Sequence, residues 1–363
     1  MLLSLQNAKP AETTDHPSDS QRRVAVVLNG NAKAVSERVV RDLRSLMDDP
    51  SSLFVSRSLD QGQFVARHIV NKGVDVVLCG GGDGTFCQVV SDVAALHPRK
   101  MPSFGVLRLG TGNALASALD ASGSNLDGLA ADLARARRRD SDADLNLLRI
   151  EGRLSPFAGI GLDSLILSDY NSVKRSLAGT PLGGLVQGGP GYAAAIATRS
   201  LWRILLEEKP EITIRNDGAP AQRIDILGRP VGRPVPRGAI LFKGPVTIAA
   251  ASTIPFYGLG LRLFPQADQR VDRFQLRVSN IDPLTVLPRL PSLFKGTFDS
   301  PEIHDFFCTA ITIQSHRPHP LQVGGDEVGE RSTMHIGMSR VRVVQGHGGA
   351  FEREALGVVR NVA

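Results

Sequence analysis

A run of three glycines followed by aspartate, glycine and threonine occupies Gly80–Thr85. It comes directly after Val74–Cys79, a continuous apolar run typical of a buried strand, and before Phe86–Leu96, which suits a helix. A glycine-rich turn between a strand and a helix offers bare backbone N–H groups and the positive end of the helix dipole to an anion. Glycine also lets a phosphate approach the main chain closely. The pattern therefore predicts a phosphate-binding loop, although the lysine of the P-loop motif does not follow it.

Asp83 lies inside this loop. A carboxylate beside phosphates makes chemical sense as a Mg²⁺ partner or as a general base. We therefore expect Asp83 to be a catalytic residue as well as part of a nucleotide-binding loop.

A second loop, Gly110-Thr111-Gly112-Asn113, has the same setting one unit later, between the short apolar run Phe104–Leu107 and a helix that starts at Ala114. Neighbouring parallel strands end side by side, so the two loops are expected to face one crevice. Asn29 and Lys33 open a third loop after the first apolar run, and a lysine there can contact phosphate as a point charge.

The elements around these loops change in character along the chain. From Arg23 to about residue 143, strand-like and helix-like stretches alternate, which predicts a Rossmann-like parallel sheet covered on both faces. After Asp144 the chain has short β-branched runs punctuated by turn residues, which predicts an antiparallel β-sandwich. These runs are Glu211–Arg215, Val246–Ala251, Phe274–Val278, Ala310–Ile313 and Ser339–Val344.

We divide the chain accordingly into a disordered tail at 1–21, an α/β nucleotide-binding domain at 22–143 and a β-sandwich domain at 144–345. The remaining segment, 346–363, is placed as a C-terminal piece that could pack back on the first domain. A chain of 363 residues is long enough for two such cores.

The composition is that of an ordinary globular protein, with 42% hydrophobic and 21% charged residues. The formal charge of +6 suits an anionic partner, while only 5% aromatic residues argue against base stacking on nucleic acid. The three cysteines have no metal-ligand or disulfide spacing, and Cys79 and Cys87 are expected to pack as small hydrophobic residues. No apolar run is long enough to span a bilayer. We expect a cytoplasmic protein with at most peripheral membrane contact and leave its oligomeric state open.

In this order, a first-strand Asn loop, a GGDGT loop and a GTGN loop resemble the catalytic domain of the diacylglycerol, sphingosine and ceramide kinase family. The resemblance continues in the second part of the chain, where segments are similar to the family's acidic strand start, its G-x-G-x-D segment and its YGGG…P-x-A…D-G stretch. These segments are Asp144-Leu145, Phe157–Asp163, Phe256–Leu261, Pro265-Gln266-Ala267 and Val271-Asp272.

The resemblance implies an α/β nucleotide-binding domain followed by a β-sandwich, with ATP and a lipid hydroxyl meeting in the cleft between them and Mg²⁺ bridging the phosphates. It implies that Asp83 is the leading acid near the γ-phosphate and that Asp163 contacts the lipid head group. The nucleotide contacts that it implies, together with neighbouring loop residues, are Asn29, Lys33, Gly81, Gly82, Asp83, Gly84, Thr85, Gly110, Thr111, Gly112 and Asn113.

Two departures from the family pattern bear on substrate and mechanism. Ala114 follows GTGN where many diacylglycerol-type members have aspartate, which is closer to the sphingosine and ceramide kinase version. Near the C-terminus the family has Asp-Gly-Glu, whereas this chain reads Gly324-Gly325-Asp326-Glu327. Aligned by the preceding strand, Gly324 takes the place of the aspartate and Asp326 that of the glutamate. A shifted loop would instead present both Asp326 and Glu327, which we consider as metal ligands, with Asp326 as a second catalytic acid.

Three other readings share part of this pattern. An NAD kinase also has GGDGT, but its NE-type motif is missing and GTGN is not expected in it. A nucleotide- or lipid-binding pseudokinase is suggested by Gly324. A phosphofructokinase-like sugar kinase shares only the short GGDG string. A lipid kinase accounts for most of the motifs.

Two cationic clusters could hold the protein on an anionic membrane surface. The first comprises Arg135, Arg137, Arg138 and Arg139, and the second comprises Arg229, Arg233, Arg237 and Lys243. For the apolar part of a lipid, the candidate lining is Leu165–Leu167 together with Leu177–Leu206.

Overall fold

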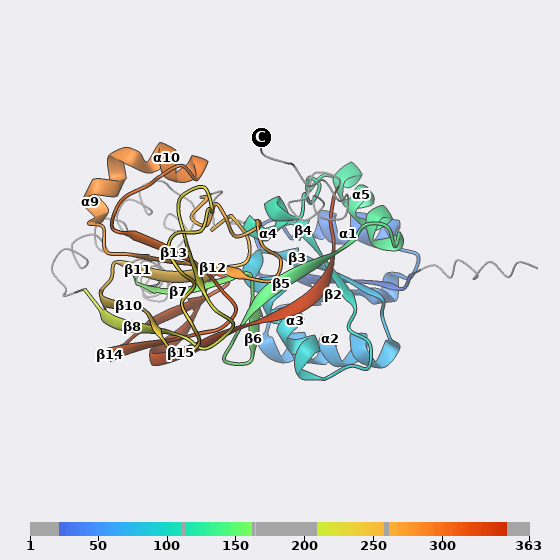
Figure 1. Ribbon diagram of the computed structural model, residues 1–363. Helices are drawn as coiled ribbons and strands as arrows, with labels where there is room; N and C mark the ends of the chain where they lie inside the picture. Colours follow the sequence, from blue (N-terminus) through green and yellow to red (C-terminus); the bar gives the residue numbers. More distant parts are fainter. Residues whose placement is uncertain (1–21, 111–112, 162–163, 165–208, 258–260, 347–363) are drawn as a thin grey trace, which may run out of the picture.

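A computed structural model describes residues 22–110, 113–161, 164, 209–257 and 261–346. The expected disordered tail and the expected lipid-lining segments Leu165–Leu167 and Leu177–Leu206 lie outside these residues. Figure 1 shows two halves side by side, one with helices on both faces of a sheet and one made almost entirely of strands. The fold class predicted from the sequence is therefore confirmed.

The first half contains a parallel sheet in the order β2-β1-β3-β4. Its strands are buried apolar runs, as expected for a sheet covered on both faces. Their bounds are β1 Val24–Asn29, β2 Leu53–Ser56, β3 Val76–Gly81 and β4 Ser103–Arg108. The helices between and after them are α1 Glu37–Leu46, η1 Pro50–Ser52, α2 Leu59–Lys72, α3 Asp83–Ala95, α4 Ala114–Ala118 and α5 Leu126–Arg137.

Helix ends in this half follow local capping rules. Ser36, Ser58 and Asn125 each accept a backbone N–H from the first turn of the helix that follows. Helix α3 differs, because its N-cap is Gly82 and no side chain caps it. The Thr85 N–H donates to Gly82 O at 3.0 Å, which leaves the N–H groups of Asp83 and Gly84, at the start of α3 in the glycine-rich loop, for another partner.

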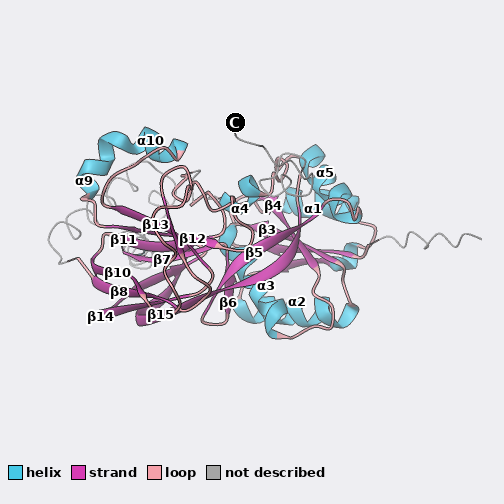
Figure 2. Cartoon of the chain, in the orientation of Figure 1, coloured by secondary structure: helices cyan, strands magenta, loops and turns pink. Residues whose placement is uncertain are grey.

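The second half is antiparallel and forms the sandwich (Figure 2). Its strands are β5 Asp142–Ile150, β6 Arg153–Ser155, β7 Phe157–Gly161, β8 Glu211–Asn216, β9 Gln222–Ile224, β10 Ile240–Pro245, β11 Ile248–Ser252, β12 Phe274–Ser279, β13 Ile303–Cys308, β14 Ile311–Val323 and β15 Asp326–Val344. Short helices α9 Pro283–Val286, η2 Leu287–Arg289 and α10 Leu290–Lys295 lie between β12 and β13.

The two halves share one sheet. Strands β5 and β15 pair over nine residues and run from the sandwich into the first half, where Val343 of β15 pairs with Phe104 of β4 (Figure 1). Gly346, the last described residue, donates its N–H to Leu119 O in the first half. The remainder of the expected C-terminal segment lies outside the described residues, and the domain limits at 22–143 and 144–345 stay a prediction.

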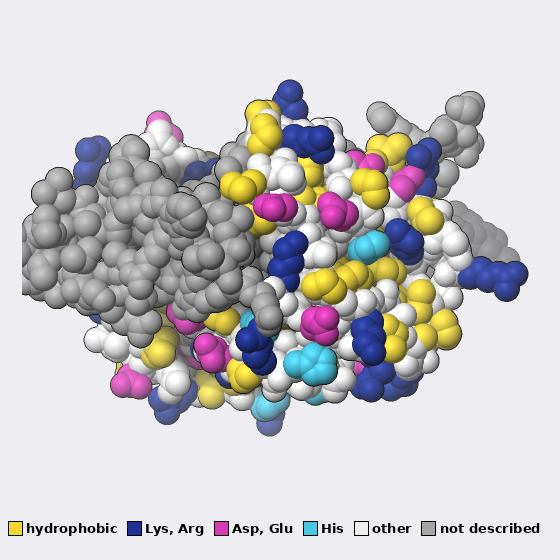
Figure 3. Space-filling model, turned by 90° about the vertical axis from the view of Figure 1, so that its left-hand side faces the viewer, with side chains coloured by type: hydrophobic (Ala, Val, Ile, Leu, Met, Phe, Trp, Pro, Cys, Tyr) yellow, Lys and Arg dark blue, Asp and Glu magenta, His cyan; other side chains and the backbone are white. Residues whose placement is uncertain are grey.

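Separate hydrophobic clusters fill the two halves, one on each face of the parallel sheet and one inside the sandwich. Cys79, Cys87 and Cys308 are buried and unpaired by any disulfide, as expected of small hydrophobic residues. Burial raises the pKa of all three thiols. Among the described residues, no helix is both long and apolar enough to cross a membrane. Figure 3 shows the sandwich end of the molecule, where cationic side chains lie among hydrophobic ones.

Candidate functional site

The two glycine-rich loops are in contact at their backbones. A Cβ atom built on Gly110 would lie closer than 3.0 Å to Gly82 Cα and to Gly81 O. No side chain fits between backbone atoms at that spacing. Because β3 and β4 are neighbouring parallel strands, their loops meet at one edge of the sheet, as predicted from the sequence.

Asn113 closes the second loop on itself. Its Oδ1 accepts the Gly110 N–H at 3.1 Å and its Nδ2 donates to Gly110 O at 2.6 Å. The residue has φ 45° and ψ 33°, a left-handed conformation that asparagine tolerates better than most residues. Thr111 and Gly112, which were also predicted to bind nucleotide, lie outside the described residues.

Asp83 joins the start of α3 to the start of α4. Its Oδ2 accepts the Ala114 N–H and its Oδ1 accepts the Leu115 N–H, each at 3.0 Å. Burial raises the pKa of the Asp83 carboxyl, and the two N–H donors oppose that shift. Both carboxyl oxygens are thus used to hold the GTGN loop against the GGGDGT loop, a contact that the sequence did not reveal.

A second set of local contacts joins the loop after β1 to the start of α3, through Asn29, Gly81 and Thr85. Asn29 Nδ2 donates to Thr85 Oγ1 at 3.1 Å, while Asn29 Oδ1 accepts the Asn31 N–H at 2.9 Å. A Cβ on Gly81 would overlap the Thr85 side chain and lie 3.2 Å from Asn29 Cβ, so glycine is needed there for packing. Lys33 follows in the exposed loop after β1 and is not part of the pocket lining.

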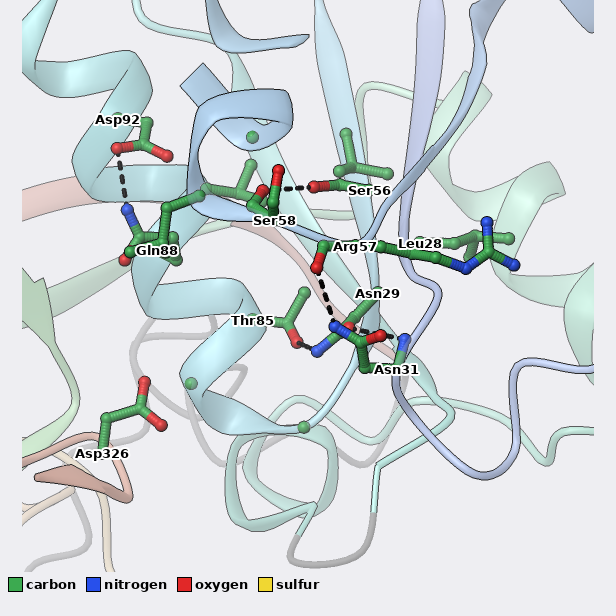
Figure 4. Close-up of a pocket in the computed structure, with 16 residues that line it drawn as sticks. Leu28, Asn29, Asn31, Ser56, Arg57, Ser58, Thr85, Gln88, Asp92 and Asp326 are labelled. Atoms are coloured by element: carbon green, nitrogen blue, oxygen red, sulfur yellow. Dashed lines mark hydrogen bonds between the residues drawn. The ribbon is translucent and has the colours of Figure 1, made fainter. Parts of the chain in front are cut away.

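A pocket of about 420 Å³ opens over these loops (Figure 4). Five of the residues predicted from the sequence line it: Asn29, Gly82, Gly84, Thr85 and Asp326. Its size is in the range of small-molecule sites in proteins. One wall comes from the GGGDGT loop and the other from the hairpin of the sandwich, so the pocket lies where the two halves meet; the described residues of the GTGN loop, Gly110 and Asn113, do not line it.

Sequence reasoning missed the third side of the pocket. The β2–α2 connection contributes Ser56, Arg57, Ser58 and Leu59, and Gly62 follows on α2. Leu59 is 64% exposed, unusual for leucine, and its apolar side chain borders the pocket. The available signal was the position of this connection at the carboxyl end of β2, the same sheet edge as the glycine-rich loops.

Farther along α3, the pocket is lined by Gln88 and Asp92. Gln88 Nε2 donates to Asp92 Oδ1 at 2.8 Å, as Figure 4 shows. The other carboxyl oxygen of Asp92 is buried without a hydrogen-bond partner among the described residues, and burial raises the pKa of this carboxyl.

The acidic wall is a two-residue β-hairpin turn. Gly324 and Gly325 have φ values of 62° and 90°, which glycine adopts without strain, and Val323 pairs with Asp326 across the turn. A Cβ on Gly324 would lie 2.5 Å from Cys87 Sγ and 3.0 Å from Ser155 Oγ. The space that an aspartate side chain would need at position 324 is therefore taken by Cys87 and Ser155.

Asp326 is the carboxylate that reaches the glycine-rich loop. A Cβ on Gly84 would lie 2.7 Å from Asp326 Oδ2, so glycine at 84 makes room for this side chain. The protein around Asp326 raises the pKa of its carboxyl by desolvation, and Arg153 partly offsets that effect. The alignment of the hairpin with the family pattern predicts an acidic residue at position 326, and Asp326 borders the pocket there.

Glu327 is the next residue of β15. Unlike Asp326, it is not among the residues that line the pocket. Among the described residues, no group of three or more acidic, histidine or cysteine side chains is arranged to bind a metal. A metal site at Asp326 and Glu327 stays a prediction, and Asp163, the predicted lipid contact, lies outside the described residues.

Comparison with known proteins identifies the first half. Residues 23–144 match the diacylglycerol kinase catalytic domain family. A probable lipid kinase (YegS-like) of Yersinia enterocolitica is 35% identical over 96 residues, which cover 25% of this chain and 31% of the relative. A protein of the same description from Serratia proteamaculans is also 35% identical over 96 residues and is covered to 31%. The match therefore spans about a third of these relatives.

Solved structures extend the similarity to the whole fold. A putative diacylglycerol kinase from Bacillus anthracis superposes with a TM-score of 0.63 at 13% identity, covering 95% of this chain and 100% of the other. A second structure from that organism, described as a diacylglycerol kinase, gives 0.59 at 14% identity, with 91% and 99% covered. At such identities the likeness concerns the fold. The sequence similarity to the diacylglycerol kinase catalytic domain family is thus confined to residues 23–144, while the similarity of fold covers nearly the whole chain.

Proposed function

We propose that this protein transfers the γ-phosphate of ATP to the hydroxyl of a diacylglycerol or sphingoid-type lipid. The observation that carries the proposal is the contact between a glycine cradle on one half and a single carboxylate on the other. Gly82, Gly84 and Thr85 lie on one side of the pocket, and Asp326 lies beside Gly84 on the other. The similarity of residues 23–144 to the diacylglycerol kinase catalytic domain supports the same activity.

The residues present fit a nucleoside triphosphate. The uncapped start of α3 supplies backbone N–H groups and a helix dipole for phosphate oxygens. Space beside Gly82 is open, since a Cβ there would meet only Gly110 Cα, at 4.0 Å. Leu59 and the β2–α2 connection offer an apolar edge for the base. ATP supplies the phosphoryl group, and Mg²⁺ bound chiefly through the phosphate oxygens would neutralise their charge.

Asp326 is the residue that we assign to proton removal from the lipid hydroxyl. It borders the pocket, and its raised pKa moves its proton affinity toward that of a useful general base. Asp83 is assigned instead to positioning, because both of its oxygens already accept N–H groups of α4. Phosphoryl transfer depends mainly on such positioning and on charge neutralisation.

The glycine at position 324 is the basis for a second candidate function, nucleotide binding without phosphate transfer. If the base must stand at position 324, where Cys87 and Ser155 leave no room for a side chain, the protein binds nucleotide without transferring phosphate. Asp326, two residues later and on the pocket wall, favours the active enzyme.

The test is transfer of labelled γ-phosphate from ATP-Mg²⁺ to a panel of diacylglycerol, sphingoid base and ceramide in mixed micelles, with NAD as a soluble acceptor. The proposal expects one lipid to be labelled and NAD to remain unlabelled. Labelling of NAD would establish a soluble-substrate kinase instead. ATP binding without transfer to any acceptor would establish the nucleotide-binding alternative.

A further inference from the structure

The segment between β9 and β10, residues 225–240, forms a well-held arm that projects hydrophobic side chains into solvent. Leu227 is 60% exposed, Val231 41% and Ile240 56%. A single exposed leucine needs no explanation. Three large aliphatic side chains exposed within one short connection indicate an interaction surface.

Backbone hydrogen bonds fix this arm to the sandwich. Val235 and Ala221 exchange N–H···O bonds of 2.7 and 2.9 Å, and Val231 N donates to Arg223 O at 2.8 Å. At the far end, Gly238 N donates to Asn216 O at 2.7 Å. The exposure of the aliphatic side chains is therefore built into a folded element.

The tip of the arm is tied to the segment of the sandwich at 264–269. Gln269 Nε2 donates to Leu227 O at 3.3 Å, and Gln266 Nε2 donates to Ile226 O. The same segment begins at Phe264, whose ring packs on that of Tyr257, and the Tyr257 hydroxyl accepts from Gln322 on β14, the strand that leads into the acidic hairpin.

Cations accompany the exposed aliphatic residues. Arg229, Arg233 and Arg237 are all exposed, and Lys243 follows on β10. Arg229 pairs with Asp225, the only acidic residue of the arm. Within the described part of the chain, Arg233 and Arg237 form no ion pair and no side-chain hydrogen bond.

The other cationic cluster of the sequence is used differently. Arg135 pairs with Asp132, Arg137 with Asp48 and Arg138 with Asp140. Three of its four charges are thus compensated inside the α/β half, and Arg135 also donates to Asp120 O and to Ser122 Oγ. This contrast makes the arm the better of the two predicted clusters for binding an external anion.

We propose that the arm docks on an anionic lipid bilayer, with Leu227, Val231 and Ile240 entering the interface and Arg233 and Arg237 contacting lipid head groups. Mixed cationic and aliphatic side chains match such a surface, because apolar insertion and charge attraction add. This proposal rests on the proposed function in one respect: a lipid substrate is the reason to expect the protein at a bilayer. Docking itself requires neither ATP nor catalysis.

The test is co-sedimentation of the full chain, without nucleotide, with vesicles of phosphatidylcholine and with vesicles in which one lipid in four is phosphatidylglycerol. We expect binding to the anionic vesicles. The double variant Arg233→Glu/Arg237→Glu should weaken it more than about twentyfold, since each cation near the surface contributes roughly fivefold. Leu227→Ser should weaken it about tenfold.

Matched controls keep the outcome specific. Arg38→Glu/Arg41→Glu changes the net charge equally on α1, and Leu126→Ser removes a leucine that is 46% exposed on α5. Both should bind as the unaltered protein does. Equal loss in arm and control variants, or no binding of the unaltered protein to anionic vesicles, would overturn the proposal. Because lipid phosphorylation in micelles is measured separately, failure of docking and failure of the kinase are told apart.

Discussion

The two walls of the pocket place different demands on the sequence. The glycine-rich loops of the parallel half act through their backbone, so the protein needs glycine where the two main chains touch, as at Gly110 against Gly81 and Gly82. The acidic hairpin of the sandwich acts through one side chain, Asp326, whose position depends on the register of β14 and β15. A backbone cradle is conspicuous in a sequence, whereas a carboxylate can move by two residues and still reach the same loop.

The largest effect should come from filling the backbone contact. Gly110→Val puts side-chain atoms where Gly82 Cα and Gly81 O now lie, so the two loops must separate. We expect at least about a hundredfold loss of ATP affinity by titration calorimetry, since small misplacements in such sites are costly. Gly337→Ala is the control, because nothing lies within 4 Å of its Cβ. Unchanged ATP affinity in Gly110→Val would show that the cradle is not the phosphate site.

Replacing Asp83 should weaken the contact between the starts of α3 and α4 without abolishing it. Asp83→Asn keeps the shape but loses one of the two charge-assisted bonds to Ala114 and Leu115 N–H. We expect the free energy of unfolding in urea to fall by about 2 kcal/mol, together with weaker ATP binding. Asp127→Asn, in the exposed first turn of α5, should change stability far less. Full stability with lost turnover would instead make Asp83 the catalytic acid predicted from the sequence.

The acidic wall can be tested by restoring the family's residue. Gly324→Asp drives a side chain into Cys87 Sγ and Ser155 Oγ, and we expect a loss of about 2 kcal/mol in the free energy of unfolding. Adding Cys87→Ala removes the nearest atom, so the pair should be coupled by about 1 kcal/mol in a double-mutant cycle. Strict additivity of the two changes would mean that Cys87 does not occupy the aspartate's space.

A smaller effect is expected in the pH dependence of stability. Desolvation raises the pKa of Asp326 above its ordinary value of 3.8, so the folded state holds the proton more tightly than the unfolded chain. The stabilisation that the folded state gains from this tighter proton binding is fully present below pH 3.8. It is lost as the pH rises through the pKa of Asp326 in the folded state. The Tm difference between the unaltered protein and Asp326→Asn should therefore fall as pH rises. A difference independent of pH would contradict the desolvated environment.

Much of the parallel half could be predicted from its sequence, because strand, glycine turn and helix follow one another in a pattern set by local physics. The strand predicted at Val74–Cys79 is β3, Val76–Gly81, and GGGDGT and GTGN were correctly joined at one sheet edge. The two carboxyl contacts of Asp83 could not be foreseen, since they depend on how α4 packs. Nor could the β2–α2 wall, whose residues carry no motif.

The sandwich was predicted only as a class of structure. Its strands were recognised as short β-branched runs, but β14 and β15 proved far longer, at 13 and 19 residues. The two strands stay paired through register shifts, and β15 extends into the other half. The side chain that faces Gly84 follows from that pairing and not from composition. Sequence reasoning therefore reached Asp326 only by alignment with the family pattern.

The most direct test of the account is single-turnover phosphate transfer to the accepted lipid by the unaltered protein and by Asp326→Asn, at saturating ATP. The account predicts unchanged ATP affinity and a transfer rate at least about a hundredfold lower in the variant, as for loss of a general base. Phosphate transfer by Asp326→Asn at the rate of the unaltered protein would contradict the assignment of Asp326 as the general base. Loss of ATP binding without a slower transfer step would contradict it as well.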